Sequence, residues 1–228
     1  MNRTIIITGA NGNLGKAVVS VFLASDWNVI GLIRKETERN SLPAHEKLDL
    51  RVVDLMEEKA VIELVETLIG EYKTIEAGIL TAGGFRMGNL GNTGSELLQQ
   101  QIDLNFKTAY HVCRPLFLHM INNNSGRIIF IGSRPALEAQ RAKSALAYGL
   151  SKSLLFTLSD ILNKEAAGSN VASSVIVPDT IDTLENRKEM PDADTSHWVK
   201  PEKIAEIMAF ITSDIAAPLR GGVFKVYG

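Results

Sequence analysis

The sequence predicts an α/β fold: a doubly wound, mostly parallel sheet of seven strands with helices on both faces, in a single domain over residues 1–228. Two observations predict it. Short apolar runs alternate with amphipathic segments along the chain, and a glycine-rich turn follows the first apolar run. Such alternation is typical of right-handed βαβ units, in which helices cover a parallel sheet. A chain of 228 residues with 45% hydrophobic content can build one substantial core of this kind.

The expected strands are short runs of aliphatic and β-branched residues, as in buried parallel sheets. They span residues 4–8, 28–33, 50–53, 78–81, 127–132, 171–177 and 223–226. The first expected helix begins near Asn13, and the others span residues 59–69, 97–121, 145–164 and 201–212. Two long irregular segments, 83–94 and 179–200, each follow an expected strand. Ligands of a parallel sheet lie beyond the carboxyl ends of its strands, so these segments are expected to form the walls of a substrate site.

The first strand runs directly into the glycine-rich segment GANGNLG at residues 9–15. Glycine lets a ligand approach the backbone closely, and the N–H groups at the start of the next helix can hold a pyrophosphate. Glycines also close ordinary turns. Here a strand precedes the turn and an amphipathic segment follows it, which favours a dinucleotide site.

Tyr148 and Lys152 lie four residues apart on an expected helix, so both side chains point from the same face. A fixed ammonium close to a phenol lowers the phenol's pKa from its usual value of about 10. The pair therefore predicts an acidic tyrosine that can exchange a proton with a ligand. The same spacing also arises by chance in ordinary helices, so the interpretation depends on the other motifs.

Composition excludes several classes of function. The net charge of −2 leaves no basic surplus for nucleic-acid binding, and no apolar segment approaches the roughly 20 residues of a membrane helix. We expect a soluble, cytoplasmic protein. The single Cys113 excludes an intrachain disulfide and is expected in the core. Asp192, Asp194 and His197 form a polar loop that is more typical of solvated surface than of a metal site, so no metal is expected.

With these motifs in order, the chain resembles the short-chain dehydrogenase/reductase family over nearly its full length. The matching positions are Thr8, Gly9, Gly12 and Gly15 in the turn, the run 81–83, Asn105, Ser133, Tyr148, Lys152 and the segment 178–183. The chain departs from the commoner pattern at Asn13, which replaces the middle glycine. It departs again at Asp179, which replaces the glycine of a Pro-Gly pair.

The resemblance implies hydride transfer between a nicotinamide cofactor and a carbonyl, alcohol or conjugated imine-like group. Tyr148 would be the general acid, and Lys152 would lower its pKa and donate to the nicotinamide ribose. Ser133 would hydrogen-bond the developing oxyanion, and Asn105 would hold a water that links Lys152 to solvent. The simpler alternatives are that Ser133 caps a strand end and that Asn105 only breaks a helix.

Charge at the end of the second strand predicts the cofactor. A carboxylate there would bind the adenosine ribose hydroxyls, whereas an arginine accommodates a 2′-phosphate. Arg34 and Lys35 stand at this point, with no carboxylate before Glu36, so NADP(H) is favoured over NAD(H). By resemblance, the cofactor-binding residues are Gly9, Asn11, Gly12, Asn13, Leu14, Gly15, Arg34, Asp54, Leu55, Ala82, Gly83, Tyr148, Lys152, Pro178, Ile181 and Thr183.

The expected substrate side chains are Phe85, Arg134, Met190 and Trp198. The loop that begins at Ala82 and the segment 181–194 also resemble those of quinonoid dihydropteridine reductases, where Phe85 would stack on a flat bicyclic ring. Arg34 and Ser133 depart from that pattern. They favour an NADP(H)-dependent oxidoreductase of small carbonyls and alcohols, with a dihydropteridine reductase as the second candidate.

A third candidate, from another class, is a non-catalytic protein that senses a dinucleotide or has a structural role. Such a protein needs only the glycine turn and the ribose contacts, and retention of all four catalytic positions argues against it. The resemblance also implies that the helices at 97–121 and 145–164 pair across a two-fold axis, so a homodimer or homotetramer is expected.

Overall fold

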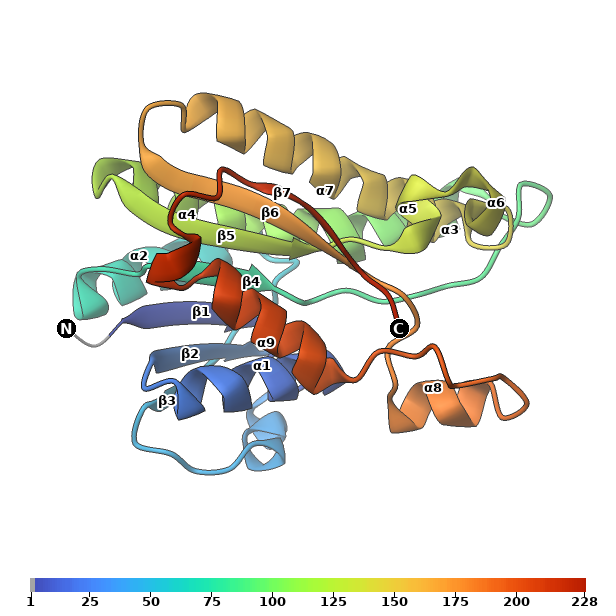
Figure 1. Ribbon diagram of the computed structural model, residues 1–228, viewed down its shortest axis with the longest axis horizontal. Coiled ribbons are helices and arrows are strands. Elements are labelled where there is room, and N and C mark those ends of the chain that lie inside the picture. Colours follow the sequence, from blue (N-terminus) through green and yellow to red (C-terminus); the bar gives the residue numbers. More distant parts are fainter. Residues whose placement is uncertain (1–2) are drawn as a thin grey trace.

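The computed structural model describes residues 3–228 and contains one seven-stranded sheet in the order β3-β2-β1-β4-β5-β6-β7 (Figure 1). Every neighbouring pair in the sheet is parallel, so the predicted α/β architecture is confirmed and the sheet is wholly rather than mostly parallel. The strands are β1 Thr4–Thr8, β2 Asn28–Ile33, β3 Leu48–Val52, β4 Ala77–Leu80, β5 Ser125–Ile131, β6 Asn170–Pro178 and β7 Gly222–Val226.

Helices cover both faces of the sheet. They are α1 Asn13–Ala24, α2 Glu58–Tyr72, α3 Ser95–Ile102, α4 Thr108–Asn122, α5 Arg134–Leu137, α6 Ala139–Ala142, α7 Leu146–Glu165, α8 Leu184–Glu189 and α9 Pro201–Ile211. Helices α1 and α9 pack on one face, and α2, α4 and α7 pack on the other. Figure 1 shows α5, α6 and α8 at the side where the strands end.

Strand β1 explains why the buried strands read as continuous apolar runs. Successive side chains of a strand point to opposite faces, and both faces of this sheet are covered. Ile5 and Ile7 accordingly join the core under α1 and α9, with Phe22, whereas Ile6 joins the core under α2 and α4, with Leu116. All three isoleucines are fully buried.

The structure corrects two local expectations and adds two short helices that were not expected. The single helix expected at 97–121 is divided into α3 and α4 by a π-helical turn, Asp103–Lys107, that buries Asn105. The segment 179–200, expected to be irregular, contains α8, and the segment after Ser133 contains α5 and α6. These short helices have no buried residue and therefore no apolar periodicity that a sequence pattern can reveal.

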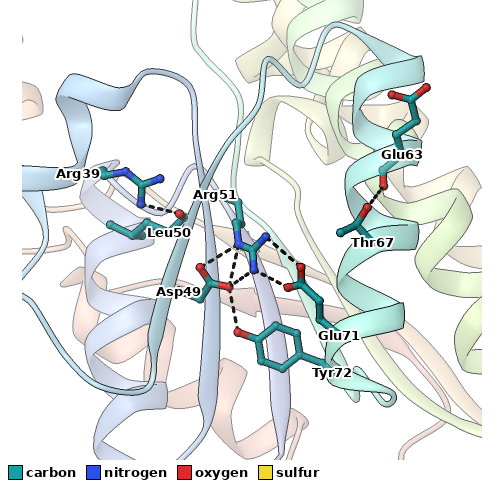
Figure 2. Close-up of polar contacts among 8 residues, drawn as sticks. All are labelled: Arg39, Asp49, Leu50, Arg51, Glu63, Thr67, Glu71 and Tyr72. Atoms are coloured by element: carbon teal, nitrogen blue, oxygen red, sulfur yellow. Dashed lines mark hydrogen bonds and ion pairs between the residues drawn. The ribbon is translucent and has the colours of Figure 1, made fainter.

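A polar cluster covers the exposed edge of β3 (Figure 2). Arg51 donates to Asp49 on the same strand, at 2.8 Å, and to Glu71 on α2, while the Tyr72 hydroxyl donates to Asp49 at 3.0 Å. Burial raises the pKa of Asp49, but the hydrogen bonds from Arg51 and Tyr72 outweigh it, so the net change is a lower pKa. Arg39 caps the Leu50 carbonyl at 2.6 Å. Charged side chains of this kind protect an edge strand from pairing with another chain.

Among residues 3–228, no helix combines the length and apolarity that crossing a membrane requires.

Candidate functional site

The candidate site lies at the carboxyl ends of the parallel strands. The strand order reverses between β1 and β4, and open α/β sheets bind their ligands at such a switch point. The glycine turn follows β1, the run 81–83 follows β4, Ser133 follows β5, and Asp179 follows β6. The fold therefore brings these separate motifs to one edge of the sheet.

The glycine turn has the geometry that its sequence predicts. Gly9 has a φ of 60°, which favours glycine, and its carbonyl oxygen accepts from Gly12 N at 2.9 Å. A Cβ atom at Gly15 would lie only 2.1 Å from the same oxygen, so that position excludes any side chain. Helix α1 has no side-chain cap and no acidic residue in its first turn. Its first N–H groups are therefore available to an anion such as a pyrophosphate.

The π-helical turn places Asn105 between the loop after β4 and helix α7. Asn105 Oδ1 accepts from Gly84 N at 3.0 Å, and Nδ2 donates to Gly84 O at 3.0 Å and to Ser151 Oγ at 3.2 Å. A Cβ atom at Gly83 would lie 2.6 Å from Asn105 Oδ1 and 3.2 Å from Lys152 Nζ. Asn105 and Lys152 thus converge on Gly83.

Lys152 is buried, and its Nζ donates to the Ile131 carbonyl at 2.9 Å. Burial lowers the pKa of the ammonium to about 8. Burial also raises the pKa of the Tyr148 phenol to about 12, and the nearby Ser133 hydroxyl opposes part of this rise. The expectation that Lys152 lowers the pKa of Tyr148 is therefore wrong for the protein chain alone, because the ammonium is directed at the β5 backbone and burial dominates at the phenol.

Ser133 has a buried hydroxyl that makes no hydrogen bond of standard geometry within residues 3–228. A buried hydroxyl without a hydrogen bond lowers the stability of the fold. Its position beside the Tyr148 phenol suits a group that hydrogen-bonds the oxygen of a bound ligand. Phe85 lies against the Tyr148 ring, edge to face, with the ring centroids 5.0 Å apart. The side chains of Ser133, Tyr148 and Phe85 therefore occupy one neighbourhood at the sheet edge.

Sequence reasoning missed the carboxylate of Glu38, which lies close to the end of β2. Arg34 is exposed, and its Nε lies 3.5 Å from Asp54 Oδ2. The Glu38 carboxylate accepts from the backbone N–H groups of Arg34 and Lys35, at 2.9 and 3.0 Å. The signal was the three-residue spacing from Lys35 to Glu38, which is that of a capping box at the start of a helical turn. His111 Nδ1 lies 2.9 Å from the Leu55 carbonyl oxygen and joins α4 to the loop after β3.

The segment around α8 holds further expected residues. Thr183 Oγ1 caps α8 by accepting from Asn186 N at 3.1 Å, and Ile181 pairs with Val199. Asn13 Nδ2 donates to Glu185 Oε2 at 2.7 Å, which joins the start of α1 to α8. Met190 and Trp198 lie in the segment that follows α8.

Arg134 is bound to Glu138 and Asp179 rather than left free at the substrate side. Within residues 3–228, no group of three His, Cys, Asp or Glu side chains is arranged to hold a metal ion.

These observations together fit a nicotinamide dinucleotide. The turn excludes side chains where a pyrophosphate must approach, the start of α1 offers free N–H groups, and the catalytic candidates gather beside them. Comparison with known proteins decides the family: the model of the short chain dehydrogenase family matches residues 3–194. The chain belongs to this family. It is therefore an NAD(P)-dependent oxidoreductase, and the alternative of a non-catalytic sensor loses its support.

Several relatives match nearly the whole chain. The 3-oxoacyl-acyl-carrier-protein reductase FabG of Chlamydia trachomatis serovar D is 26% identical over 100% of this chain and 97% of its own length. A dihydropteridine reductase of Dictyostelium discoideum is 27% identical over 99% of this chain and 94% of its own length. A solved structure, ElxO with NADP bound, has a TM-score of 0.91 at 19% identity and covers 99% of this chain and 97% of its own. At that identity the structure supports the fold.

Substitution of Gly15 tests the turn. In Gly15→Ala the new Cβ would lie 2.1 Å from the Gly9 carbonyl oxygen, so the turn must move. We expect the Kd for the nicotinamide dinucleotide, measured by fluorescence titration, to rise at least about tenfold, a loss of about 1.4 kcal/mol. Gly70→Ala in α2 is the matched control, because nothing lies within 4 Å of its Cβ. It should leave the Kd unchanged and add about 0.5–1 kcal/mol of stability. Equal affinities of Gly15→Ala and wild type would contradict the assignment of the turn.

The buried Lys152 predicts how stability changes with pH. Its pKa is about 8 in the folded chain, against 10.5 for an unperturbed lysine. Between these values the unfolded state binds more protons, so this lysine makes stability rise with pH. Relative to Lys152→Met, we expect wild type to gain roughly 2 kcal/mol in its free energy of unfolding between about pH 7 and about pH 10. Urea unfolding of both proteins measures this difference, and a difference that does not change with pH would show that the ammonium is not desolvated.

Proposed function

We propose that this protein is an NADP(H)-dependent reductase of small carbonyl compounds, or the corresponding alcohol dehydrogenase, with Tyr148 as its general acid and base. The observation that carries the proposal is the convergence of Ser133, Tyr148 and Lys152 at the sheet edge, beside the glycine turn of the switch point. A bound nicotinamide supplies or accepts the hydride. The proposed cofactor-binding residues are Gly9, Asn11, Gly12, Asn13, Leu14, Gly15, Arg34, Asp54, Leu55, Ala82, Gly83, Tyr148, Lys152, Pro178, Ile181 and Thr183.

The roles of the catalytic side chains follow from their environments. In the reducing direction Tyr148 donates its proton to the substrate oxygen as negative charge develops there. Ser133, whose hydroxyl makes no hydrogen bond of standard geometry to any residue in 3–228, donates a hydrogen bond to the same oxygen. Lys152 is charged below its pKa of about 8, and its ammonium can donate to the nicotinamide ribose as well as to the Ile131 carbonyl. Asn105 holds the Gly84 backbone and the Ser151 hydroxyl in place beside this lysine.

The preference for NADP(H) rests on Arg34. An exposed guanidinium at the end of β2 can pair with a 2′-phosphate through two parallel hydrogen bonds. The solved structure of ElxO contains NADP, which supports the same preference. The Glu38 carboxylate opposes this preference. It accepts from the backbone N–H groups of Arg34 and Lys35, so its negative charge lies close to the place where a 2′-phosphate would bind.

A quinonoid dihydropteridine reductase is the second candidate. Phe85 is half exposed beside Tyr148 and can stack on a flat ring, and Met190 and Trp198 follow α8 as they would in a substrate loop. The Dictyostelium discoideum relative carries this name. The unpartnered hydroxyl of Ser133 favours a carbonyl oxygen as the reacting atom, because a conjugated imine needs less help at an oxyanion.

We also propose a homodimer or homotetramer in the cytoplasm. Helices α4 and α7 each carry large apolar side chains on their exposed faces, such as Leu118 on α4 and Leu150 and Ile161 on α7. Two such faces can pack against their copies across a two-fold axis.

Tyr148→Phe tests the proposed chemistry. We expect kcat to fall about 100-fold or more, because general acid catalysis contributes about 10²–10⁴-fold, while the affinity for NADPH stays within about threefold. The assay follows NADPH oxidation with quinonoid dihydropterin and with a panel of aldehydes, ketones and quinones. Tyr110→Phe on α4 is the matched control, and its kcat should not change. Full activity of Tyr148→Phe would refute the proposed role, and turnover of the pterin alone would favour the second candidate.

Arg34→Gln tests cofactor choice. Loss of the guanidinium should raise the Kd for NADPH about tenfold or more and leave the Kd for NADH within about twofold, because only NADPH carries the 2′-phosphate. Fluorescence titration of both cofactors into the same variant provides its own control. An equal loss for both cofactors, or no loss for either, would show that Arg34 does not determine the preference.

A further inference from the structure

Arg134 follows Ser133 directly, and its guanidinium is held on every side. Nε and Nη2 donate to the two carboxylate oxygens of Glu138 at 2.9 and 3.0 Å, and Nη1 donates to Asp179 Oδ2 at 2.5 Å. The guanidinium carbon lies 4.5 Å from the centre of the Tyr227 ring. Arg134 therefore joins α5, the end of β6 and the residue after β7.

Asp179 directly follows Pro178, the last residue of β6. Its backbone N–H donates to the Val226 carbonyl at 3.0 Å, so β7 fixes its position. The side chains of Arg134 and Asp179 are only 20% and 17% exposed, which makes this pair less screened by solvent than a surface ion pair. Three of its five N–H groups donate to two carboxylates, which also neutralise the positive charge that a substrate anion would need. The expected direct contact of Arg134 with substrate is therefore not the role that this geometry favours.

Ser133 lies between two anchored stretches of backbone. On one side Lys152 holds the Ile131 carbonyl, and Gly132 N donates to Ile176 O at 2.8 Å. On the other side is α5, which has four residues and no side-chain cap, so it is too short to be stable by itself. The contacts of Arg134 with Glu138, Asp179 and Tyr227 help to hold this short helix in place.

Helix α5 also lies directly against the helix of the catalytic tyrosine. A Cβ atom at Gly149 would lie 2.9 Å from the Pro135 carbonyl oxygen. Gly149 follows Tyr148, so a movement of α5 changes the distance between the Ser133 hydroxyl and the phenol. The position of α5 therefore determines whether both groups can address one substrate oxygen.

We propose that Arg134, Asp179 and Tyr227 form a clamp that positions the Ser133 hydroxyl toward the reacting oxygen, with Arg134 as a positioning residue that does not touch the substrate. The inference rests on the proposed function. A hydrogen-bond donor to an oxyanion contributes about 10²–10³-fold to kcat, and this contribution depends on its geometry.

The test is a double-mutant cycle between the clamp and Ser133. In the full-length enzyme with its best substrate, Arg134→Met should lower kcat about 10-fold or more and change KM less than about threefold. In a Ser133→Ala background the same substitution should lower kcat less than about twofold further, because the group that it positions is already gone. Asp179→Asn should act in the same direction. Arg51→Met is the matched control: Arg51 is also held by two carboxylates, Asp49 and Glu71, but at the β3 edge of the sheet, and its loss should leave kcat within about twofold.

Other outcomes overturn the clamp. A rise in KM that persists in the Ser133→Ala background would show that Arg134 binds the substrate directly. Losses that multiply across the two substitutions, together with a lower melting temperature, would show a merely structural role. If Arg134→Met does not fold, Asp179→Asn and Tyr227→Leu test the same clamp from its other two sides.

Loss of activity in Ser133→Ala and Tyr148→Phe, with Arg134→Met unaffected, overturns the clamp alone. Full activity of both Ser133→Ala and Tyr148→Phe overturns the proposed function and the clamp with it.

Discussion

The parallel direction of all strands is the constraint on which the rest of this structure depends. Because each strand ends at the same edge, the turns after β1, β4, β5 and β6 open next to one another, although their residues are far apart in the chain. The same arrangement requires helices on both faces, which explains the apolar run of Ile5, Ile6 and Ile7. Fold stability and the location of the site therefore have a common origin.

The polar groups of the site are buried at a cost to stability. In the part of the chain that the structure describes, the desolvated ammonium of Lys152 donates to a backbone carbonyl alone, and the Ser133 hydroxyl has no hydrogen-bond partner of standard geometry. A sequence selected for stability alone would replace such groups, since buried charges and unsatisfied donors are destabilising. Asn105 differs from them, because its amide is fully engaged with the Gly84 backbone and Ser151. The site thus contains one amide, Asn105, whose hydrogen-bonding groups are engaged within the protein, and two side chains, Lys152 and Ser133, that can still hydrogen-bond a ligand.

Charges at the sheet edge are largely paired within the protein. Arg134 is neutralised by Glu138 and Asp179, and Arg34 lies near Asp54. Paired charges position backbone and loops. The pairing of Arg134 with two carboxylates is consistent with the proposal of a neutral carbonyl substrate.

The sequence by itself determined the fold class, all seven strands to within about two residues, and the order of the motifs, because apolar periodicity and glycine spacing are local properties. It also placed Tyr148 and Lys152 on one helix, one turn apart, which α7 confirms. Only the tertiary structure decided that Lys152 bonds the Ile131 carbonyl, that Glu38 accepts from the backbone beside Arg34, and that Arg134 is held from three elements. These contacts join residues through folded backbone, burial and ion pairing, and none of them has a period or spacing that a linear pattern can express.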